Sequence, residues 1–210
     1  MKRFFIIWLS LLCVLCCQAQ QRHALIVAIA NYPKESGWNS IHSNNDLQIL
    51  LPQFDRLGFR INTLTDKQAT KKNIIQALQH LIKQLKAGDD VCLHFSCHGQ
   101  QMEDDNGDEA DELDEALIPY DAQSTYQKGI YEGENHLRDD ELEKFLISIR
   151  QKIGIDGSVL ITFDACHSGT ANRIEEYVED DDAPIRGTNV IFSSNPFYIC
   201  LLYTSPSPRD

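Results

Sequence analysis

Basic residues are scarce in this chain of 210 residues, which has 19 lysines and arginines against 31 aspartates and glutamates. The formal net charge is −12. Nucleic-acid-binding domains usually carry a basic patch, so this balance argues against a nucleic-acid partner. It also disfavours adhesion to anionic membranes, which attract basic segments. We therefore expect neither nucleic acid nor a membrane surface among the partners.

Long apolar runs are also missing after the N-terminus. Residues 2–3 are basic, residues 4–17 are apolar, and residues 17–19 form a small-residue cleavage pattern, which together predict a signal peptide over 1–19. The apolar segment is too short for a comfortable transmembrane helix. An alternative is a lipoprotein acylated at Cys16 or Cys17. We expect an exported, periplasmic or extracellular protein with no stable membrane insertion after cleavage.

A dense cysteine framework is absent as well, because three of the seven cysteines lie in the N-terminal segment. The others are too few and too uneven to predict a disulfide scaffold. The spacing of Cys92, His94, Cys97 and His98 invites a zinc site. Along a strand, however, Cys92 and His94 share one face while Cys97 faces the other, so the ligands would not converge.

Apolar periodicity predicts one α/β domain without internal repeats, with a mainly parallel central sheet and helices on both faces. A proline at position 52 predicts a kink or a later start in the first helix. Thr70 is the predicted N-cap of the second helix. The expected strands cover residues 23–30, 59–64, 90–96, 159–163 and 189–194, and the expected helices cover 44–57, 69–87 and 139–153.

The stretch from Gly157 to Thr170 is the centre of the functional argument. Its apolar run at residues 159–163 is typical of a strand buried on both faces, and Cys166 follows it closely. A thiol at a strand end lies at the rim of the sheet, where open α/β sheets bind ligands. The alternative is a buried structural cysteine.

A second stretch of the same form, residues 90–99, ends in Ser96, Cys97, His98 and Gly99. If the two strands are parallel neighbours, His98 and Cys166 reach the same edge, as a thiol nucleophile and its base should. His167 is a rival base. Because adjacent residues leave a strand end in opposite directions, we favour His98.

The motifs HFSCHG and DACHSG, with HALIVAIANY, DEALIPYDA and LRDDEL, resemble the caspase-like cysteine peptidases. The resemblance covers about residues 23–196 and is to the metacaspase branch and its bacterial relatives. It implies a three-layer sandwich, a Cys166 nucleophile and a His98 base that a backbone carbonyl could orient. It also implies an oxyanion held by the backbone N–H groups of Cys166 and Gly99. Cys97 departs from the family, which usually has glycine there.

The same resemblance implies a substrate pocket for a basic residue before the cleaved bond. Asp164 and Asp46 match pocket aspartates, and Ser96 matches a pocket serine. Two buried carboxylates call for a cation, so arginine or lysine is expected. For Asp46 the alternative is a charge that only complements a helix N-terminus.

Calcium is a further implication of the resemblance, and no other cofactor is expected. The acidic run at residues 103–115 does not fit an EF-hand loop and on its own predicts a solvated surface. In several metacaspases a calcium ion binds four aspartates. Asp114, Asp139 and Asp140 match three of them, but Arg173 stands at the fourth position.

The C-terminal part departs from the family. Residues 173–187 match the acidic linker that is cut on maturation, and residues 197–210 match no strand or helix template. We expect a peptidase domain over 20–196, truncated after its large-subunit region, with a non-native tail. The alternatives to an active endopeptidase are a catalytically inactive caspase-like binding module and a calcium-binding structural domain.

Overall fold

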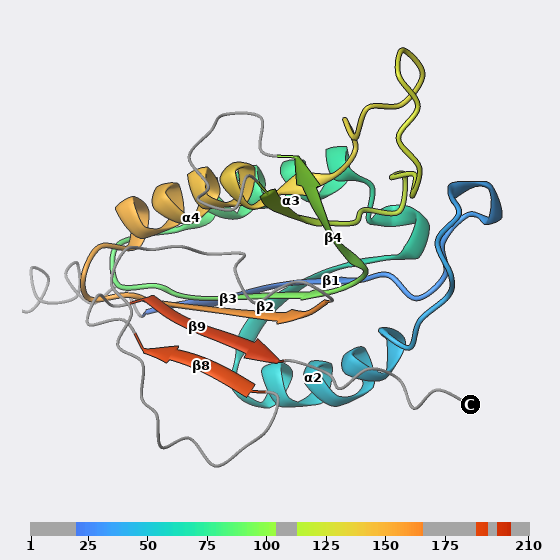
Figure 1. The fold of residues 1–210 in the computed structure, drawn as a ribbon. Helices are drawn as coiled ribbons and strands as arrows, with labels where there is room; N and C mark the ends of the chain where they lie inside the picture. Colours follow the sequence, from blue (N-terminus) through green and yellow to red (C-terminus); the bar gives the residue numbers. More distant parts are fainter. Residues whose placement is uncertain (1–19, 104–112, 166–187, 193–196, 203–210) are drawn as a thin grey trace, which may run out of the picture.

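The structure is a computed structural model that describes residues 20–103, 113–165, 188–192 and 197–202. Its centre is a six-stranded sheet with the order β2-β1-β3-β7-β9-β8, in which every neighbouring pair is parallel except β8 with β9 (Figure 1). The strands are β1 (Arg22–Ala28), β2 (Phe59–Thr65), β3 (Asp90–Ser96), β7 (Ser158–Asp164), β8 (Thr188–Phe192) and β9 (Phe197–Leu202).

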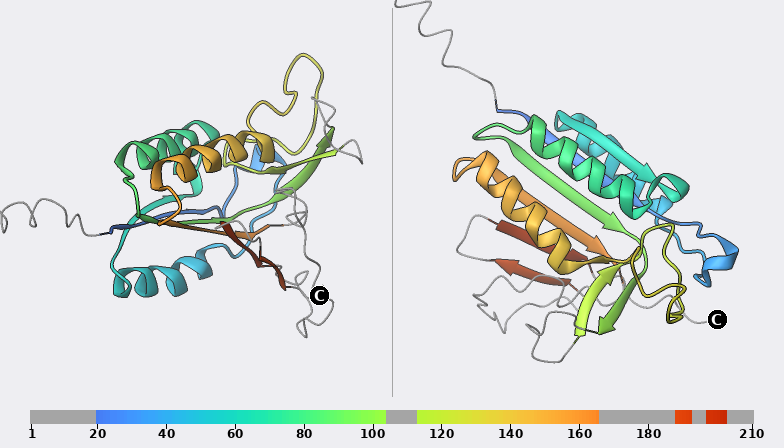
Figure 2. Two further views of the ribbon diagram at one scale, coloured as in Figure 1. Left: turned by 90° about the vertical axis from the view of Figure 1, so that its left-hand side faces the viewer. Right: turned by 90° about the horizontal axis from the view of Figure 1, so that it is seen from above.

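Helices cover both faces of this sheet. Helix α2 (Asn44–Arg56) lies on one face, and α3 (Lys71–Gln84) and α4 (Asp139–Ile153) lie side by side on the other (Figures 1 and 2). Short 3-10 turns occur at Lys34–Ser36 and Asp66–Gln68. The predicted three-layer α/β architecture is therefore confirmed.

Local sequence explains where α3 and α4 begin. The Thr70 hydroxyl accepts a hydrogen bond from the Asn73 N–H at 3.3 Å, so Thr70 is the N-cap of α3 as predicted. Acidic residues fill the first turn of α4, where they complement the helix dipole. Both helices bury one apolar stripe: Ile74, Ala77, Leu78 and Leu81 in α3, and Leu142, Leu146, Ile149 and Ile153 in α4.

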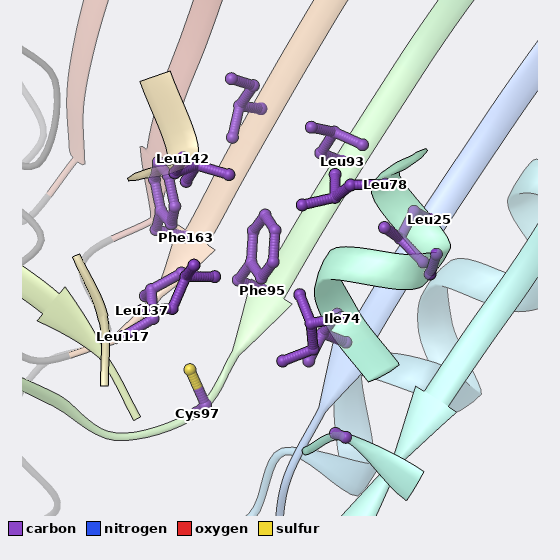
Figure 3. Packing of buried hydrophobic residues seen from close by; sticks show 14 of the residues in the cluster. Leu25, Ile74, Leu78, Leu93, Phe95, Cys97, Leu117, Leu137, Leu142 and Phe163 are labelled. Atoms are coloured by element: carbon purple, nitrogen blue, oxygen red, sulfur yellow. The ribbon is translucent and has the colours of Figure 1, made fainter. Parts of the chain in front are cut away.

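The hydrophobic core lies between these two helices and the sheet. Alternate residues of β1, β3 and β7 point into it, because successive side chains of a strand face opposite ways. At its centre Phe95 and Phe163 stack with their ring centroids 5.7 Å apart (Figure 3). Cys97 also packs into this cluster and is 3% exposed. Its thiol is therefore part of the core.

A second, antiparallel sheet begins where β3 ends. It has the order β4-β5-β6, formed by Gly99–Glu103, Leu113–Leu117 and Leu137–Arg138. This sheet was not expected from the sequence. Its strand β5 contains the end of the acidic run, residues 113–115. Residues 104–112 lie outside the described part of the chain.

One expectation about the main elements is wrong, and another is decided only in part. Helix α2 begins at Asn44 and contains Pro52, so it does not start late, and the alternative of a kink at Pro52 stays a prediction. Residues 197–202, expected to have no regular structure, form β9 between β7 and β8. All six residues of β9 are apolar, as is typical of an interior strand with both faces covered.

Other expectations about the chain ends are not addressed by the described residues. Residues 1–19, the linker at 173–187 and residues 203–210 lie outside them, so the signal peptide and the non-native tail stay predictions. Within the described ranges, no helix is both long and apolar enough to cross a bilayer.

Candidate functional site

The predicted catalytic residues follow the paired ends of β3 and β7. These strands are in parallel register with Ser96 opposite Asp164, and the Cys97 N–H donates to the Asp164 carbonyl at 3.2 Å. His98 is two residues beyond Ser96, and Cys166 is two residues beyond Asp164. The described chain stops at Ala165 here, so the approach of the thiol to His98 stays a prediction.

The His98 imidazole is fixed by aromatic rings and by a backbone carbonyl. It stacks on Trp38 with the centroids 5.0 Å apart, and the Tyr32 ring lies 5.1 Å away. Its Nε2 is 2.8 Å from the Asn39 carbonyl oxygen. A carbonyl oxygen only accepts, so Nε2 carries the proton and Nδ1 has the lone pair. This tautomer leaves Nδ1 able to take a proton as a general base.

Tyr32 also holds the backbone of His98 in place. Its buried hydroxyl donates to the Ile118 carbonyl at 2.8 Å and accepts from the His98 N–H at 3.1 Å. The Ile118 N–H in turn donates to the His98 carbonyl at 2.9 Å. Burial raises the pKa of Tyr32, so the phenol keeps its proton. The hydroxyl therefore joins the loop after β1 to the segment between β3 and β4.

The three predicted pocket residues come together on the α2 side of the sheet. Asp46 lies in the first turn of α2, Ser96 ends β3 and Asp164 ends β7. Burial raises the pKa of the Asp46 carboxyl, but hydrogen bonds from His94 and Ser96 outweigh this, and Asp164 acts in the same direction. The net effect holds the pKa below its usual value. Asp46 is thus both a helix-terminal charge and a member of this cluster.

Sequence reasoning considered His94 only as a zinc ligand and missed its place in this cluster. Its Nε2 is 3.3 Å from Asp46 Oδ2, and its Nδ1 is 2.6 Å from the Thr162 hydroxyl. The side chain is 2% exposed. Among the described residues, no group of three or more His, Cys, Asp and Glu side chains is placed to hold a metal ion. The period-two alternation of β3 was the signal that put His94 and Ser96 on one face.

The predicted calcium ligands are only partly described. Asp139 and Asp140 open α4, and the Asp140 N–H donates to Asp139 Oδ1 at 3.0 Å. Pairing of β5 with β6 puts Ala116 opposite Arg138, so the backbone of Asp114 runs close to the start of α4. The side chain of Asp114 lies outside the described part. Two carboxylates beside an arginine do not make a calcium site by themselves, because calcium takes six to eight oxygens.

A cavity of about 510 Å³ lies beside β4, between that strand and the loop before β6. In its wall the Tyr131 hydroxyl and Gln100 Oε1 each lie 2.9 Å from a ring nitrogen of His136. Burial, helped by the charges of Arg138 and Lys71, lowers the pKa of His136 to about 4. A neutral His136 therefore holds Gln100 of β4, the residue after Gly99, in place by a hydrogen bond.

The comparisons with known proteins agree on one family. A family model described as metacaspase, peptidase C14 domain, matches residues 22–175. Metacaspase-1B of Aspergillus fumigatus is 35% identical over 127 residues, which are 56% of this chain and 28% of that protein. Metacaspase-2 of Arabidopsis thaliana is 30% identical over 184 residues, 80% of this chain and 41% of that protein. The chain thus spans less than half the length of these relatives.

The fold comparison gives a solved relative as well. A crystal structure of a protein from Geobacter sulfurreducens matches with a TM-score of 0.54 and 30% identity, over 71% of this chain and 52% of that one. The family model covers more than half of the chain, and its span includes the strands that lead to His98 and Cys166. The chain belongs to the metacaspase family of C14 peptidases.

Proposed function

We propose that the protein is a cysteine endopeptidase that cleaves after arginine or lysine, with Cys166 as nucleophile and His98 as base. The observation that carries the proposal is the state of His98. Its Nε2 donates to the Asn39 carbonyl, so in the neutral ring Nδ1 has the lone pair. His98 follows the end of β3, which is level with the end of β7, the strand that leads to Cys166.

The proposed reaction is an acyl transfer in two steps. His98 Nδ1 takes the thiol proton and the Cys166 sulfur attacks the scissile carbonyl carbon. Backbone N–H groups of Cys166 and Gly99 stabilise the tetrahedral oxyanion. When the C–N bond breaks, the imidazolium gives its proton to the leaving amine. Water then attacks the thioester, with His98 again as the base, and releases the new carboxyl terminus and the thiol.

The preference for a basic residue rests on the Asp46, Ser96 and Asp164 cluster. Asp46 keeps an ionised carboxylate at a site where its side chain is 24% exposed. Asp164, half-buried, interacts with the same carboxylate. A guanidinium or ammonium group would satisfy this negative charge with charge-assisted hydrogen bonds. An acidic side chain would be repelled.

The test is turnover of peptides with arginine or lysine before the cleaved bond, with and without calcium. Cys166→Ala should abolish hydrolysis, and His98→Ala should lower kcat by about 10²–10⁴-fold, the usual worth of a general base. Ser168→Ala, close to the nucleophile in sequence, is the control and should keep its activity. Turnover retained in Cys166→Ala would overturn the assignment. Peptide binding without turnover in the unaltered chain would favour the inactive binding module.

We also propose that the protein works after export, because residues 1–19 have the three parts of a signal peptide. N-terminal sequencing of the mature protein should begin at Gln20. A mature protein that still starts at Met1 would contradict export by this route.

A further inference from the structure

We propose that His94 is a positioning residue of the pocket, which holds the Asp46 carboxylate in place for the cationic side chain of the substrate. This inference rests on the proposed preference for arginine or lysine. In this proposal His94 has no direct role at the scissile bond. It acts through Asp46.

Both ring nitrogens of His94 have partners on different elements. Nε2 meets Asp46 Oδ2 of α2 at 3.3 Å, and Nδ1 meets the Thr162 hydroxyl of β7 at 2.6 Å. The ionised Asp46 carboxylate only accepts, so Nε2–H donates to it, and in the neutral ring Nδ1 then accepts from the Thr162 hydroxyl. The His94 side chain is 2% exposed, so these two partners hold the ring where water has little access.

The need for such a contact follows from how α2 is attached. None of the residues of α2, Asn44–Arg56, is buried. The apolar residues of α2, such as Leu47 and Phe54, are only half-buried, so apolar packing fixes the first turn of α2, which carries Asp46, less firmly than it fixes the other two helices. By contrast, α3 and α4 each bury four residues of an apolar stripe. The His94 imidazole is buried and has a polar partner at each ring nitrogen, so its contact with Asp46 holds that carboxylate at a fixed position on the sheet.

The Asp46 carboxylate is held by His94 on its buried side, and its exposed side is available to a substrate. His94 is almost fully buried, whereas the Asp46 side chain is 24% exposed. Ser96, the next residue on the same face of β3, adds a second hydrogen bond. A carboxylate fixed in this way loses little conformational entropy when a guanidinium binds.

Two neutral variants of nearly the same size separate positioning from packing. The amide nitrogen of His94→Gln reaches about as far as Nε2 and can still donate to Asp46. The amide of His94→Asn reaches only about as far as Nδ1, so it can keep Thr162 but loses Asp46. Each variant is made in the full chain with Cys166→Ala, which prevents turnover. Binding of fluorescent peptides ending in arginine or in uncharged, nearly isosteric citrulline is measured by anisotropy.

The parent chain should bind the arginine peptide more tightly than the citrulline peptide. His94→Asn should reduce this preference about tenfold or more, the usual worth of a hydrogen bond to a charged group, with citrulline binding unchanged. His94→Gln should keep most of the preference. An equal loss in both variants, or none in His94→Asn, would overturn the inference while arginine preference in the parent stands.

If the parent does not distinguish the two peptides, the basic preference fails and this inference fails with it. If His94→Asn does not fold, Thr162→Val takes its place. That variant removes the hydroxyl that holds Nδ1 of His94 and should lower the arginine preference several-fold. An unchanged preference in a folded Thr162→Val would overturn the inference.

Discussion

The face of the central sheet under α3 and α4 and the face toward α2 are built from alternate residues of the same strands. In β3, Val91, Leu93 and Phe95 enter the apolar core, while Cys92, His94 and Ser96 point the other way. The first face is covered by two helices with apolar stripes. Within the described residues, the second is covered by one helix that has no fully buried residue, and there Leu160 of β7 is 37% exposed.

With the proposed pocket on the second face, this difference separates the residues that stabilise the fold from those that would recognise the substrate. Aromatic and aliphatic side chains on the first face remove a large apolar area from water, which is the main favourable term in folding. Small and polar side chains on the second face surround the Asp46 carboxylate, with hydrogen bonds from His94 and Ser96. Neighbouring residues of one strand should therefore respond very differently to substitution.

The sharpest test of that separation is a pair of adjacent substitutions in β3. Phe95→Ala should lower the free energy of unfolding by about 3–5 kcal/mol, because it leaves a cavity where Phe95 stacks on Phe163. Ser96→Ala should cost much less stability but weaken the preference for basic peptides. Denaturant unfolding and paired peptide assays measure the two effects. Similar losses of stability in both variants would break the comparison.

A change on the recognition face alone comes next in size. Asp164→Asn should cost arginine and lysine substrates about 2–5 kcal/mol in transition-state binding, because their charge loses a desolvated partner. Uncharged substrates should be nearly unaffected. The measurement is kcat/KM for matched charged and neutral peptides. Equal losses for both would mean that Asp164 serves the fold instead.

Most elements of the first face, and some of those of the second, could be predicted from the sequence. Apolar periodicity located α3 and α4, since a helix that buries a stripe repeats it every three to four residues. Pairing of β3 with β7 followed from two runs of the same form, and it led to the expectation that His98 and Cys166 share one edge. Ser96 and Asp164 were assigned to the pocket by the family resemblance. Asp46 came only from the family resemblance.

What the sequence could not supply depends on contacts between distant segments. The Asn39 carbonyl has no side-chain signature, and the Tyr32 hydroxyl lies far from His98 in the chain. The small sheet β4-β5-β6 was missed because its strands are short and acidic residues interrupt the pattern. Strand β9 was missed because an apolar run without alternation does not distinguish a strand from other buried segments.

Substitution of Tyr32 should lower both stability and activity, each by less than the substitutions above. Tyr32→Phe removes the hydroxyl that binds the His98 N–H and the Ile118 carbonyl. Leaving these buried groups unpaired should cost about 1–3 kcal/mol of stability and also lower kcat. Tyr126→Phe is the control, because the Tyr126 ring is 63% exposed. A loss of stability with unchanged kcat would show that the hydrogen bonds of the Tyr32 hydroxyl do not position His98 for catalysis.

The smallest expected effect lies outside both faces, at the start of α4. We propose weak activation by calcium, seen only at high concentration, with Asp114, Asp139 and Asp140 as ligands. A carboxylate there is also stabilised by the helix dipole without any metal. Asp140→Ala should remove the activation in a calcium titration of peptide turnover, and Asp105→Ala should leave it intact. Equal sensitivity of the two variants would assign the acidic run to a solvated surface.

The register of the sheet has a consequence for how this protein can vary. Ala28, Ser96 and Asp164 lie on one rung across β1, β3 and β7, and the base follows that rung by two residues. Inserting residues into the helical connections would leave the rung intact. Deleting one residue near the start of β3 would turn His94 and Ser96 together toward the core. The proposed pocket and the proposed base are thus inherited as one unit, and lineages should accept length changes between the strands far more readily than inside them.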